Sequence, residues 1–398
     1  MDVVGAAMNT AARSDTSPLR VALNAGALRS PLTGIGQYVL HLGRHLRQRP
    51  ELAMDFFYGR RFSAEAEAAP SRAGPLRTWV RRFVPHAYAI RRALEQRQFN
   101  RGRSAKTYDV YHEPNYLTLE FDGPKIITVH DLSWLRYPQM HPAERVRAMN
   151  RYFEPCLRSA SLLLTDSVFV KNEIVEVFGT DPSLIHPIAL GLDSAFRPLN
   201  AAQTHEVLSS HGLTHGEYYL CAGTLEPRKN VQATVAAYAA LPQRVRDTHP
   251  LVLAGMKGWR TSSLERALEP LVRSGHARIL GYLERGELAA VTAGALTLVY
   301  PSLYEGFGLP PLEAMGCGVP PITSNASSLP EVVGDSGIMV HPDDTDALRE
   351  AMLSMACDPG LRACLSAKAL TRAAQFSWER CAAETAAAYR RAAASTSR

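Results

Sequence analysis

Short apolar runs alternate along the chain with segments of helical periodicity. The apolar runs fall at residues 19–25, 55–58, 109–112, 125–130, 162–165 and 184–189, and again at 218–222, 250–254, 277–280, 296–300 and 321–323. Such runs are typical of strands buried on both faces of a parallel sheet, with helices in the crossovers. The pattern therefore predicts an α/β fold of two Rossmann-like, doubly wound domains that face a cleft.

Helical segments and chain breakers suggest where the domains divide. Helices are predicted at residues 36–48, 143–158 and 169–178, the last with Ser167 as its N-cap, and the chain after Asp346 is almost purely helical. A stretch containing Pro, Asn, His and Gly follows residue 191. We expect a mobile leader at residues 1–18, a first domain at 19–190, a second at 191–376 and a C-terminal helix at 377–398, capped by Ser377.

Composition narrows the class of protein. The chain has 398 residues, of which 46% are hydrophobic and 21% charged, so disorder, a collagen-like repeat and a disulfide scaffold are excluded. Its six cysteines form no C-x-x-C pair and are expected to be structural and reduced. No stretch resembles a signal peptide or a membrane span, so we expect a cytoplasmic protein.

The net charge of +6 is concentrated in one basic segment, residues 72–106. Its basic residues are Arg72, Arg77, Arg81, Arg82, Arg91, Arg92, Arg97, Arg101, Arg103 and Lys106. Glu95 is the single acid among them, and four aromatic residues are interleaved. The segment indicates an anionic partner, although a solvated helical hairpin explains the same residues.

Two glutamates eight residues apart follow a predicted strand in the second domain, in the sequence Y-E-G-F-G-L-P-P-L-E. Gly306 and Gly308 permit a close backbone approach, and the helix start beyond them favours an anion such as a diphosphate. Glu313, on the first helical turn, is placed to bind a ribose diol, and Glu305 to face the group beyond the phosphates. The alternative is an ordinary strand–loop–helix with solvated acids.

A second motif, C-A-G-T-L-E-P-R-K-N at residues 221–230, also follows a strand. Gly223 and Thr224 predict a tight turn. Arg228 and Lys229 are adjacent at the predicted start of a helix, where the helix dipole disfavours cations. Their position indicates an anion that they neutralise, the guanidinium by clamping two oxygens and the ammonium as a point charge. A solvated basic pair is the alternative.

Two further strand ends carry candidate residues in the first domain. Gly34 and Gly36, in G-I-G, follow the first strand and open a helix, as in a phosphate-cradling loop, but a tight helix entry explains them equally well. His130 and Asp131 end another strand, so their side chains are expected at the edge of the cleft. Imidazole suits hydrogen bonding and proton transfer near neutral pH, although a satisfied structural histidine is the alternative.

The order of these motifs over residues 19–390 resembles that of the family 4 retaining glycosyltransferases, which have the two-domain B-type fold. The motifs are G-I-G, H-D, D-S-x-F-x-K at 166–171, G-L-D at 191–193, G-T-x-x-P-R-K-N, G-Y-L at 281–283 and E-G-F-G-L-P-x-L-E. The resemblance implies that the C-terminal helix crosses back to pack on the first domain.

The resemblance also implies a role for each motif. Arg228 and Lys229 would bind the donor diphosphate, Glu313 the ribose and Glu305 the donor sugar, while His130 would contact the transferred sugar. The implied catalytic residues are His130, Arg228, Lys229 and Glu305. The implied donor-binding residues are Gly34, Gly36, Gly223, Thr224, Tyr282, Leu283, Gly306, Phe307, Gly308, Leu309 and Glu313. Of these, Tyr282 and Leu283 match the stretch that lines the nucleobase, and the Gly34 loop would close over the phosphates or admit the acceptor.

No cofactor or metal is expected, because the two cations and a helix start supply the positive charge that a leaving diphosphate needs. No D-x-D motif follows a strand, and Asp343 and Asp344 lie in a late turn. Members of this family retain anomeric configuration, and the resemblance favours front-face attack by the acceptor hydroxyl. Glu305 would then position the sugar and not act as a nucleophile.

The segments at residues 23–39 and 129–138 resemble bacterial mannosyl- and rhamnosyltransferases of surface polysaccharide synthesis. This implies a GDP-sugar donor and a lipid-linked glycan acceptor, with a UDP-hexose donor as the alternative. The basic segment would then hold the enzyme on the anionic inner face of the cytoplasmic membrane. From other classes, a sugar-nucleotide epimerase or a nucleic-acid-binding protein remains open, although no nucleic-acid-binding signature is present.

Overall fold

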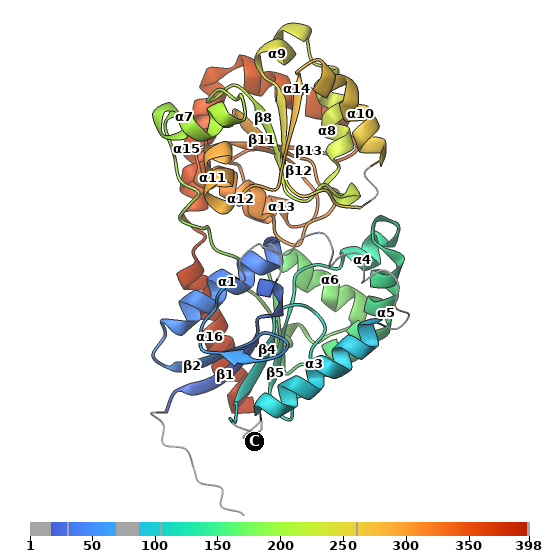
Figure 1. Cartoon of the computed structure of the whole chain (residues 1–398), viewed down its shortest axis with the longest axis vertical. Helices are drawn as coiled ribbons and strands as arrows, with labels where there is room; N and C mark the ends of the chain where they lie inside the picture. The colour runs from blue at the N-terminus through green and yellow to red at the C-terminus, as the bar shows by residue number, and fades with distance from the viewer. Residues whose placement is uncertain (1–16, 30–31, 69–86, 104–105, 260–261, 396–398) are drawn as a thin grey trace, which may run out of the picture.

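The computed structural model describes residues 17–29, 32–68, 87–103, 106–259 and 262–395. The expected leader at residues 1–18 and the first half of the basic segment lie almost wholly outside this range. The described chain forms two α/β domains arranged one above the other along the long axis of the molecule (Figure 1). The predicted fold class is confirmed.

The first domain contains a seven-stranded sheet of order β3-β2-β1-β4-β5-β6-β7, parallel except for the β2–β3 pair. The strands are β1 (Leu19–Asn24), β2 (Leu52–Phe57), β3 (Phe62–Ser63), β4 (Val110–Glu113), β5 (Lys125–Val129), β6 (Leu162–Thr165) and β7 (Ile185–Pro187). β3 was not predicted, because two residues are too short to show a pattern.

Helices cover both faces of this sheet, in separate groups. They are α1 (Gly34–Arg47), α3 (Ala87–Arg103), α4 (Ser133–Arg136), α5 (Ala143–Arg158), α6 (Val168–Phe178) and α16 (Trp378–Ser395), with 3₁₀ turns η1 (Gly26–Arg29), η2 (Pro138–Met140) and η3 (Pro182–Leu184). Residues of α1 and α16 share one apolar cluster with Val21 and Ile126, whereas those of α5 and α6 pack with Ile127 and Val129. Neighbouring strand residues thus face opposite helical layers.

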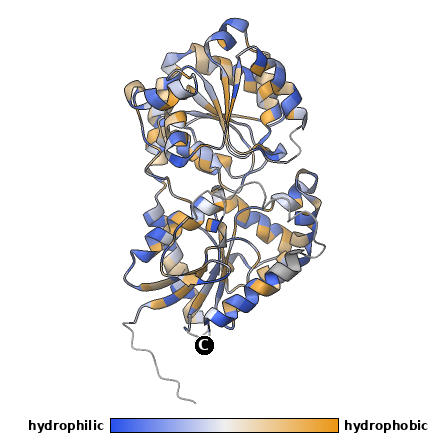
Figure 2. Cartoon of the chain, viewed as in Figure 1, coloured by the Kyte–Doolittle hydropathy of each residue, from blue (hydrophilic) through white to orange (hydrophobic). Residues whose placement is uncertain are grey.

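The second domain repeats this architecture on a six-stranded parallel sheet of order β10-β9-β8-β11-β12-β13. Its strands are β8 (Tyr219–Ala222), β9 (Leu251–Ala254), β10 (Ala277–Gly281), β11 (Thr297–Tyr300), β12 (Pro321–Ser324) and β13 (Ile338–Val340). β13 was not predicted from the sequence. Both sheets are coloured mainly as hydrophobic in Figure 2, as expected for doubly covered sheets.

The helices of the second domain again lie in two layers. They are η4 (Pro227–Lys229), α7 (Ala201–Ser210), α8 (Val231–Ala239), α9 (Gln243–Thr248), α10 (Ser262–Arg273), α11 (Arg285–Ala293), α12 (Leu309–Gly316), α13 (Leu329–Val333), α14 (Thr345–Cys357) and α15 (Pro359–Ala373). Side chains of α8, α10 and α14 pack on one face of the sheet, and those of α7, α11 and α12 on the other. Ser167 is the N-cap of α6, as predicted, and accepts from the N–H of Val170.

The chain crosses between the domains twice, and the two crossings are bonded to each other. Leu192 N–H donates to the carbonyl of Phe376 at 3.1 Å. An added Cβ on Gly191 would lie 2.2 Å from the backbone nitrogen of Trp378, so only glycine permits this approach. After the second crossing α16 lies beside α1 on the first domain (Figure 1).

A series of buried side-chain hydrogen bonds connects α16 to the sheet of the first domain. His112 of β4 contacts the Tyr389 hydroxyl through Nδ1 at 2.7 Å and the Thr128 hydroxyl through Nε2 at 2.8 Å. Burial lowers the pKa of His112 to about 3, so the ring is neutral. Among the helices of the described ranges, none combines the length and the apolar composition that crossing a bilayer requires.

Candidate active site

A cleft of about 500 Å³ lies between the ends of the two sheets, with lining residues from both domains. The predicted residues that line it are Gly34, His130, Gly223, Thr224, Arg228, Lys229, Tyr282, Leu283, Glu305, Gly306, Phe307, Gly308, Leu309 and Glu313. Side chains up to 279 positions apart in the sequence thus meet at the edges where parallel strands end.

Gly36 is the predicted site residue that does not line the cleft. An added Cβ there would lie 2.9 Å from Cδ2 of Leu32, so the glycine serves the close packing of the loop before α1. Gly34 does face the cleft, and an added Cβ would lie 3.9 Å from Cδ1 of Leu309 in the second domain. The G-I-G loop therefore stands opposite the start of α12.

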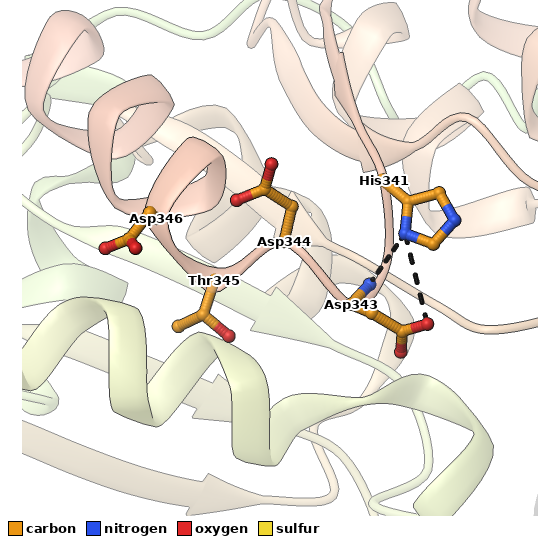
Figure 3. A pocket seen from close by; sticks show the side chains of 5 residues that line it. All are labelled: His341, Asp343, Asp344, Thr345 and Asp346. Atoms are coloured by element: carbon orange, nitrogen blue, oxygen red, sulfur yellow. Dashed lines mark hydrogen bonds and ion pairs between the residues drawn. The ribbon is translucent and has the colours of Figure 1, made fainter.

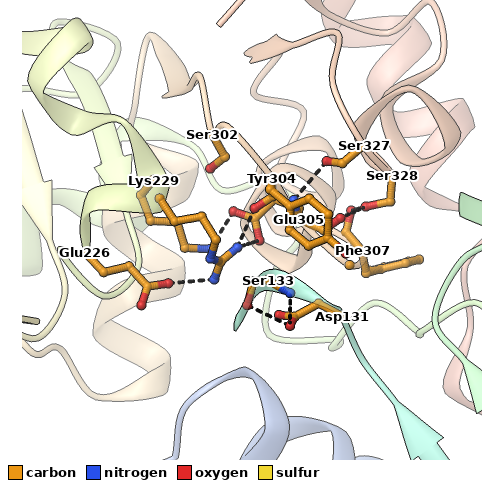
Figure 4. A network of polar contacts seen from close by, with 12 residues as sticks. Asp131, Ser133, Glu226, Lys229, Ser302, Tyr304, Glu305, Phe307, Ser327 and Ser328 are labelled. Carbon is orange, nitrogen blue, oxygen red and sulfur yellow. Dashed lines mark hydrogen bonds and ion pairs between the residues drawn. The ribbon is translucent and has the colours of Figure 1, made fainter. Parts of the chain in front are cut away.

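Arg228 and Lys229 converge on the carboxylate of Glu305. Lys229 Nζ lies 2.7 Å from Oε1 of Glu305 (Figure 4). Arg228 Nη1 lies 2.9 Å from Oε2 of the same carboxylate. Arg228 Nη2 also contacts Glu226 Oε1 at 2.6 Å, and Lys229 donates to the hydroxyl of Tyr300. The cluster is buried, and its two cations are balanced by two carboxylates.

The backbone geometry of η4 presents these two cations to the cleft. Arg228 and Lys229 lie on a 3₁₀ turn that precedes α8, and not on the first turn of α8 as the sequence suggested. Asn230 follows with φ of 54°, and its side-chain amide donates to the carbonyls of Pro301 and Pro342. The turn is thus tied to the loops after β11 and β13.

Glu305 is held in its charged form. Its N–H donates to Ser327 Oγ at 2.8 Å, and its carbonyl accepts from Ser328 Oγ at 2.9 Å (Figure 4). Burial alone would raise the pKa of Glu305, but the charges of Arg228 and Lys229 outweigh it and bring the pKa to about 2. Burial lowers the pKa of Lys229, which Glu305 opposes.

The backbone from Gly306 to Leu309 faces the same cleft with free donors. No acceptor within the described ranges takes up the N–H groups of these four residues. Pro310 and Pro311 have no N–H, so the preceding amides are the donors that the start of α12 offers an anion. Gly308 has φ of 119°, which favours glycine.

Gly306 also brings the two domains together. An added Cβ would lie 1.7 Å from the carbonyl oxygen of His130, so this approach requires glycine. The Gly306 carbonyl accepts from Ser167 Oγ at 2.7 Å, and Leu132 N–H donates to the Tyr304 hydroxyl at 2.9 Å. The loop that carries Glu305 is therefore hydrogen-bonded directly to residues that follow β5 and β6 of the first domain.

Both ring nitrogens of His130 are already engaged. Nδ1 lies 2.7 Å from Oδ2 of Asp166, and Nε2 lies 2.8 Å from the carbonyl oxygen of Pro114. Burial would lower the pKa of His130, but the Asp166 carboxylate and the Pro114 carbonyl raise it overall. Two acceptors favour a doubly protonated ring, so this arrangement leaves no free ring nitrogen for proton transfer to a ligand.

Glu313 belongs to a second buried charge network, which sequence reasoning missed. Arg285 Nη1 lies 2.7 Å from Glu313 Oε1, and its Nε lies 2.7 Å from Asp193 Oδ2. His41 of α1 lies 3.4 Å from the same Asp193 oxygen. Burial would raise the pKa of Asp193, but hydrogen bonds from His41, from a backbone N–H and from Arg285 lower it overall.

Local sequence patterns carry little signal for this network. Asp193 belongs to the G-L-D motif, but the motif assigns it no partner. Arg285 follows Leu283 by two positions, and nothing in its surroundings indicates a partner 92 residues earlier. The network links the glutamate expected to bind ribose with the interdomain crossing and with α1.

The acidic turn at the start of α14 lies outside the cleft. His341, Asp343, Asp344, Thr345 and Asp346 line an open hollow there (Figure 3). Asp344 is the N-cap of α14 and accepts from the N–H of Ala347 at 2.8 Å. In the described part of the chain, no group of three or more His, Cys, Asp or Glu side chains is arranged to hold a metal ion.

Comparisons with known proteins agree with the geometry. The protein-family model described as Glycosyltransferase Family 4 matches residues 32–196 of the sequence. The family model described as Glycosyl transferases group 1 matches residues 208–372. The O-antigen chain mannosyltransferase B of Escherichia coli is 38% identical over 371 residues, which cover 91% of this chain and 97% of the relative. The serotype-specific mannosyltransferase WbdA of Escherichia coli is 33% identical over 262 residues, 64% of this chain and 32% of that protein.

Among solved structures, a sucrose-phosphate synthase from Thermosynechococcus elongatus superimposes with a TM-score of 0.73 at 22% sequence identity. The match covers 95% of this chain and 100% of that structure, so the likeness extends over both domains. The motifs, the cleft between the two sheets and these matches lead to one conclusion. The chain belongs to the family 4 glycosyltransferases with the two-domain B-type fold.

Proposed function

We propose that the chain transfers mannose from GDP-mannose to a hydroxyl of a lipid-linked glycan in O-antigen or related polysaccharide synthesis, with retention of anomeric configuration. The names of the two Escherichia coli relatives favour mannose over rhamnose, and that of the first favours O-antigen as the product class. The observation that carries the proposal is the position of Arg228 and Lys229 beside the free amides from Gly306 to Leu309, with Glu313 on the following helical turn.

These groups suit a diphosphate leaving group. As the bond between C1 of the sugar and the phosphate oxygen breaks, negative charge develops on the diphosphate, and Arg228 and Lys229 stabilise it. The acceptor oxygen forms the new bond to C1, and its proton passes to the departing phosphate oxygen. Because two side-chain cations supply the charge, we propose that the reaction needs no metal ion.

The state of Glu305 supports front-face attack. A carboxylate whose pKa is about 2 and whose two oxygens are taken up by Lys229 and Arg228 is a weak nucleophile. It is well placed to fix the orientation of these cations and of the donor sugar. The proposal therefore includes retention without a covalent glycosyl-enzyme intermediate.

Nucleotide-dependent stabilisation tests the donor. GDP, UDP, ADP and TDP are added to the protein with magnesium or with a chelator, and the melting temperature is measured, because a ligand that binds the native state raises it. We expect a selective rise with GDP that the chelator does not change. A selective rise with UDP would contradict the assignment of the donor, and a rise that needs magnesium would contradict metal independence.

Arg285→Ala is expected to weaken nucleoside diphosphate binding about tenfold, because Glu313 loses the partner that orients it. Arg285→Lys should restore part of the affinity, since ammonium replaces one of the two contacts. Titration calorimetry at a temperature where the variant is folded measures the Kd. The control is Arg273→Ala, whose side chain is exposed and pairs with Glu269 on the same helix. An unchanged Kd in Arg285→Ala would show that Glu313 needs no such support.

The described half of the basic segment divides into structural and exposed cations. Arg92 donates to the carbonyls of Leu117 and Thr118, and Arg103 and Lys106 pair with Asp122 and Asp55. These three cations make contacts within the first domain. Arg97 and Arg101 remain exposed on α3.

We propose that Arg97 and Arg101 contribute to peripheral contact with an anionic membrane. Reversing both charges, Arg97→Glu with Arg101→Glu, should weaken binding to phosphatidylglycerol vesicles roughly 30-fold or more, since each basic residue near such a surface contributes about 1 kcal/mol. Vesicle sedimentation measures the binding, and Arg244→Glu with Arg266→Glu gives the same charge change on exposed residues of the second domain. An equal loss of vesicle binding in both double variants would show that the net charge of the protein, and not α3, determines the binding.

A further inference from the structure

The cleft continues past Arg228 into a region to which the motifs assign no ligand. Its lining includes His141 and Arg145, at the junction of η2 with α5, and Trp259, in the loop after β9 of the second domain. Asp131 and Glu226 line the same part of the cleft. Both domains therefore contribute polar side chains beside the cation pair.

His141 is buried in this region without a hydrogen-bond partner. Its side chain is 3% exposed, and neither Nδ1 nor Nε2 meets a donor or acceptor anywhere in the described chain. Burying a polar group without a partner is unfavourable, so a native protein that retains one has a use for it. A ligand in the cleft would supply the missing partners.

The protonation state of His141 indicates which ligand group fits. Burial lowers the pKa of the ring, and the charge of Arg145 lowers it further, against the opposing effect of Asp131. A neutral imidazole offers one N–H donor and one nitrogen acceptor. A hydroxyl group, which donates one hydrogen bond and accepts others, is complementary to this pair.

Trp259 provides an apolar wall beside this histidine. Its ring centroid lies 5.9 Å from that of His141, and its indole N–H donates across the cleft to the carbonyl of Met140. The ring is therefore fixed in place when the two domains are together. A flat aromatic surface beside hydroxyl-binding groups suits a pyranose ring, which has an apolar face and a polar rim.

The charges nearby favour an uncharged ligand over a phosphate. Arg145 is at the mouth of the cleft, but the carboxylates of Asp131 and Glu226 face the same space. Within the described residues, one oxygen of Glu226 accepts from Arg228 and the other accepts none, whereas the Asp131 carboxylate accepts from Ser133 and also contacts the Tyr116 hydroxyl. The two negative charges would repel an anion, and the free Glu226 oxygen would accept from a sugar hydroxyl.

We propose that His141, Trp259, Asp131 and Glu226 form the acceptor subsite, in which the terminal pyranose of the glycan packs on Trp259 and shares a hydroxyl with His141. This proposal rests on the proposed function, since the site must lie beside the donor sugar. It assigns the recognition of an uncharged sugar at this position to residues of both domains.

The test uses methyl α-mannopyranoside as the probe, with saturation-transfer NMR in the presence of GDP. We expect binding to the wild-type protein, and about tenfold weaker binding to His141→Phe and to Trp259→Ala, with the stabilisation by GDP unchanged in both. His141→Asn, which keeps a donor and an acceptor, should retain part of the affinity. His205→Phe, on the exposed side of α7, is the matched control.

The outcomes separate this proposal from the proposed function. Wild-type protein that is stabilised by GDP but gives no saturation transfer from the glycoside would overturn the acceptor subsite alone, as would unchanged affinity in both His141→Phe and Trp259→Ala. Weakened stabilisation by GDP in these variants would place the residues in the donor site and also overturn it. A wild-type protein that no nucleoside diphosphate stabilises would instead contradict the proposed function.

Discussion

Replacing Lys229 with alanine is expected to lower kcat for sugar transfer roughly 10²- to 10³-fold, the size of effect seen when one group that stabilises developing charge is removed. The ammonium lies 2.7 Å from Glu305 and faces the cleft beside free backbone donors. Its interaction with the diphosphate grows as the leaving group gains charge, so kcat should fall more than the affinity for donor.

The fold should survive this change. Glu305 keeps its contact with Arg228 at 2.9 Å, so no carboxylate is left without a partner. Steady-state kinetics with saturating donor measure kcat, and the melting temperature reports the fold. Lys368→Ala is the control, because that ammonium is on the surface and pairs with Asp335. A folded Lys229→Ala protein with wild-type kcat would remove Lys229 from the reaction.

Replacing Glu305 with glutamine is expected to destabilise the free protein by about 3 kcal/mol, because removing one member of a buried ion pair leaves the other charge uncompensated. Glu226 still pairs with Arg228, so the loss in unfolding free energy should be at the lower end of the usual range. Lys229 is most affected, because Glu305 is its carboxylate partner. Activity should also fall, since both cations lose the group that orients them.

A nucleoside diphosphate should partly reverse this loss. Its phosphates bring back negative charge beside Arg228 and Lys229, so the ligand should raise the melting temperature of Glu305→Gln more than that of the wild type. Glu269→Gln, which removes an exposed carboxylate paired with Arg273, is the control and should change stability little. Equal stabilisation of Glu305→Gln and the wild type would show that the diphosphate does not bind at these cations.

The stabilising effect of Glu305 should depend on pH in a defined direction. Its pKa falls from 4.5 in the unfolded chain to about 2 in the folded protein, which corresponds to about 3 kcal/mol. A lowered carboxyl pKa gives stability that is complete above pH 4.5 and is lost as the pH falls toward 2. The difference in unfolding free energy between wild type and Glu305→Gln, measured in denaturant, should therefore stay constant from pH 5 to 8 and shrink below 4.5. A difference that grows on acidification would contradict the charged state of Glu305.

The sequence predicts the parts of this enzyme that have local signals. Short apolar runs predict the central strands, and strand ends followed by Gly turns indicate Arg228, Lys229, Glu305 and Glu313. The family resemblance adds their joint location in one cleft. The short strand β3 escapes prediction, because two residues cannot establish a period. β13 also escapes it, whereas β7, of the same length, is predicted from the longer apolar run around it.

Contacts between distant residues could not be predicted. The pairing of Arg228 with Glu305 joins positions 77 apart, and that of His130 with Asp166 joins positions 36 apart. Nothing in the local sequence indicates that His130 uses both ring nitrogens on its own domain, or that His141 uses neither. Such features depend on how two folded domains meet, and they determine which residues are free to bind a ligand.

The most direct test of the proposed reaction is an assay with GDP-mannose and a mannose-terminated oligosaccharide, in the presence of a chelator. Mass spectrometry follows the addition of one hexose and the release of GDP, and NMR of the product gives the configuration at the new linkage. We expect transfer with an α linkage, unchanged by the chelator and roughly 10²- to 10³-fold slower in Lys229→Ala. A β-linked product, or transfer that Lys229→Ala leaves intact, would contradict this expectation.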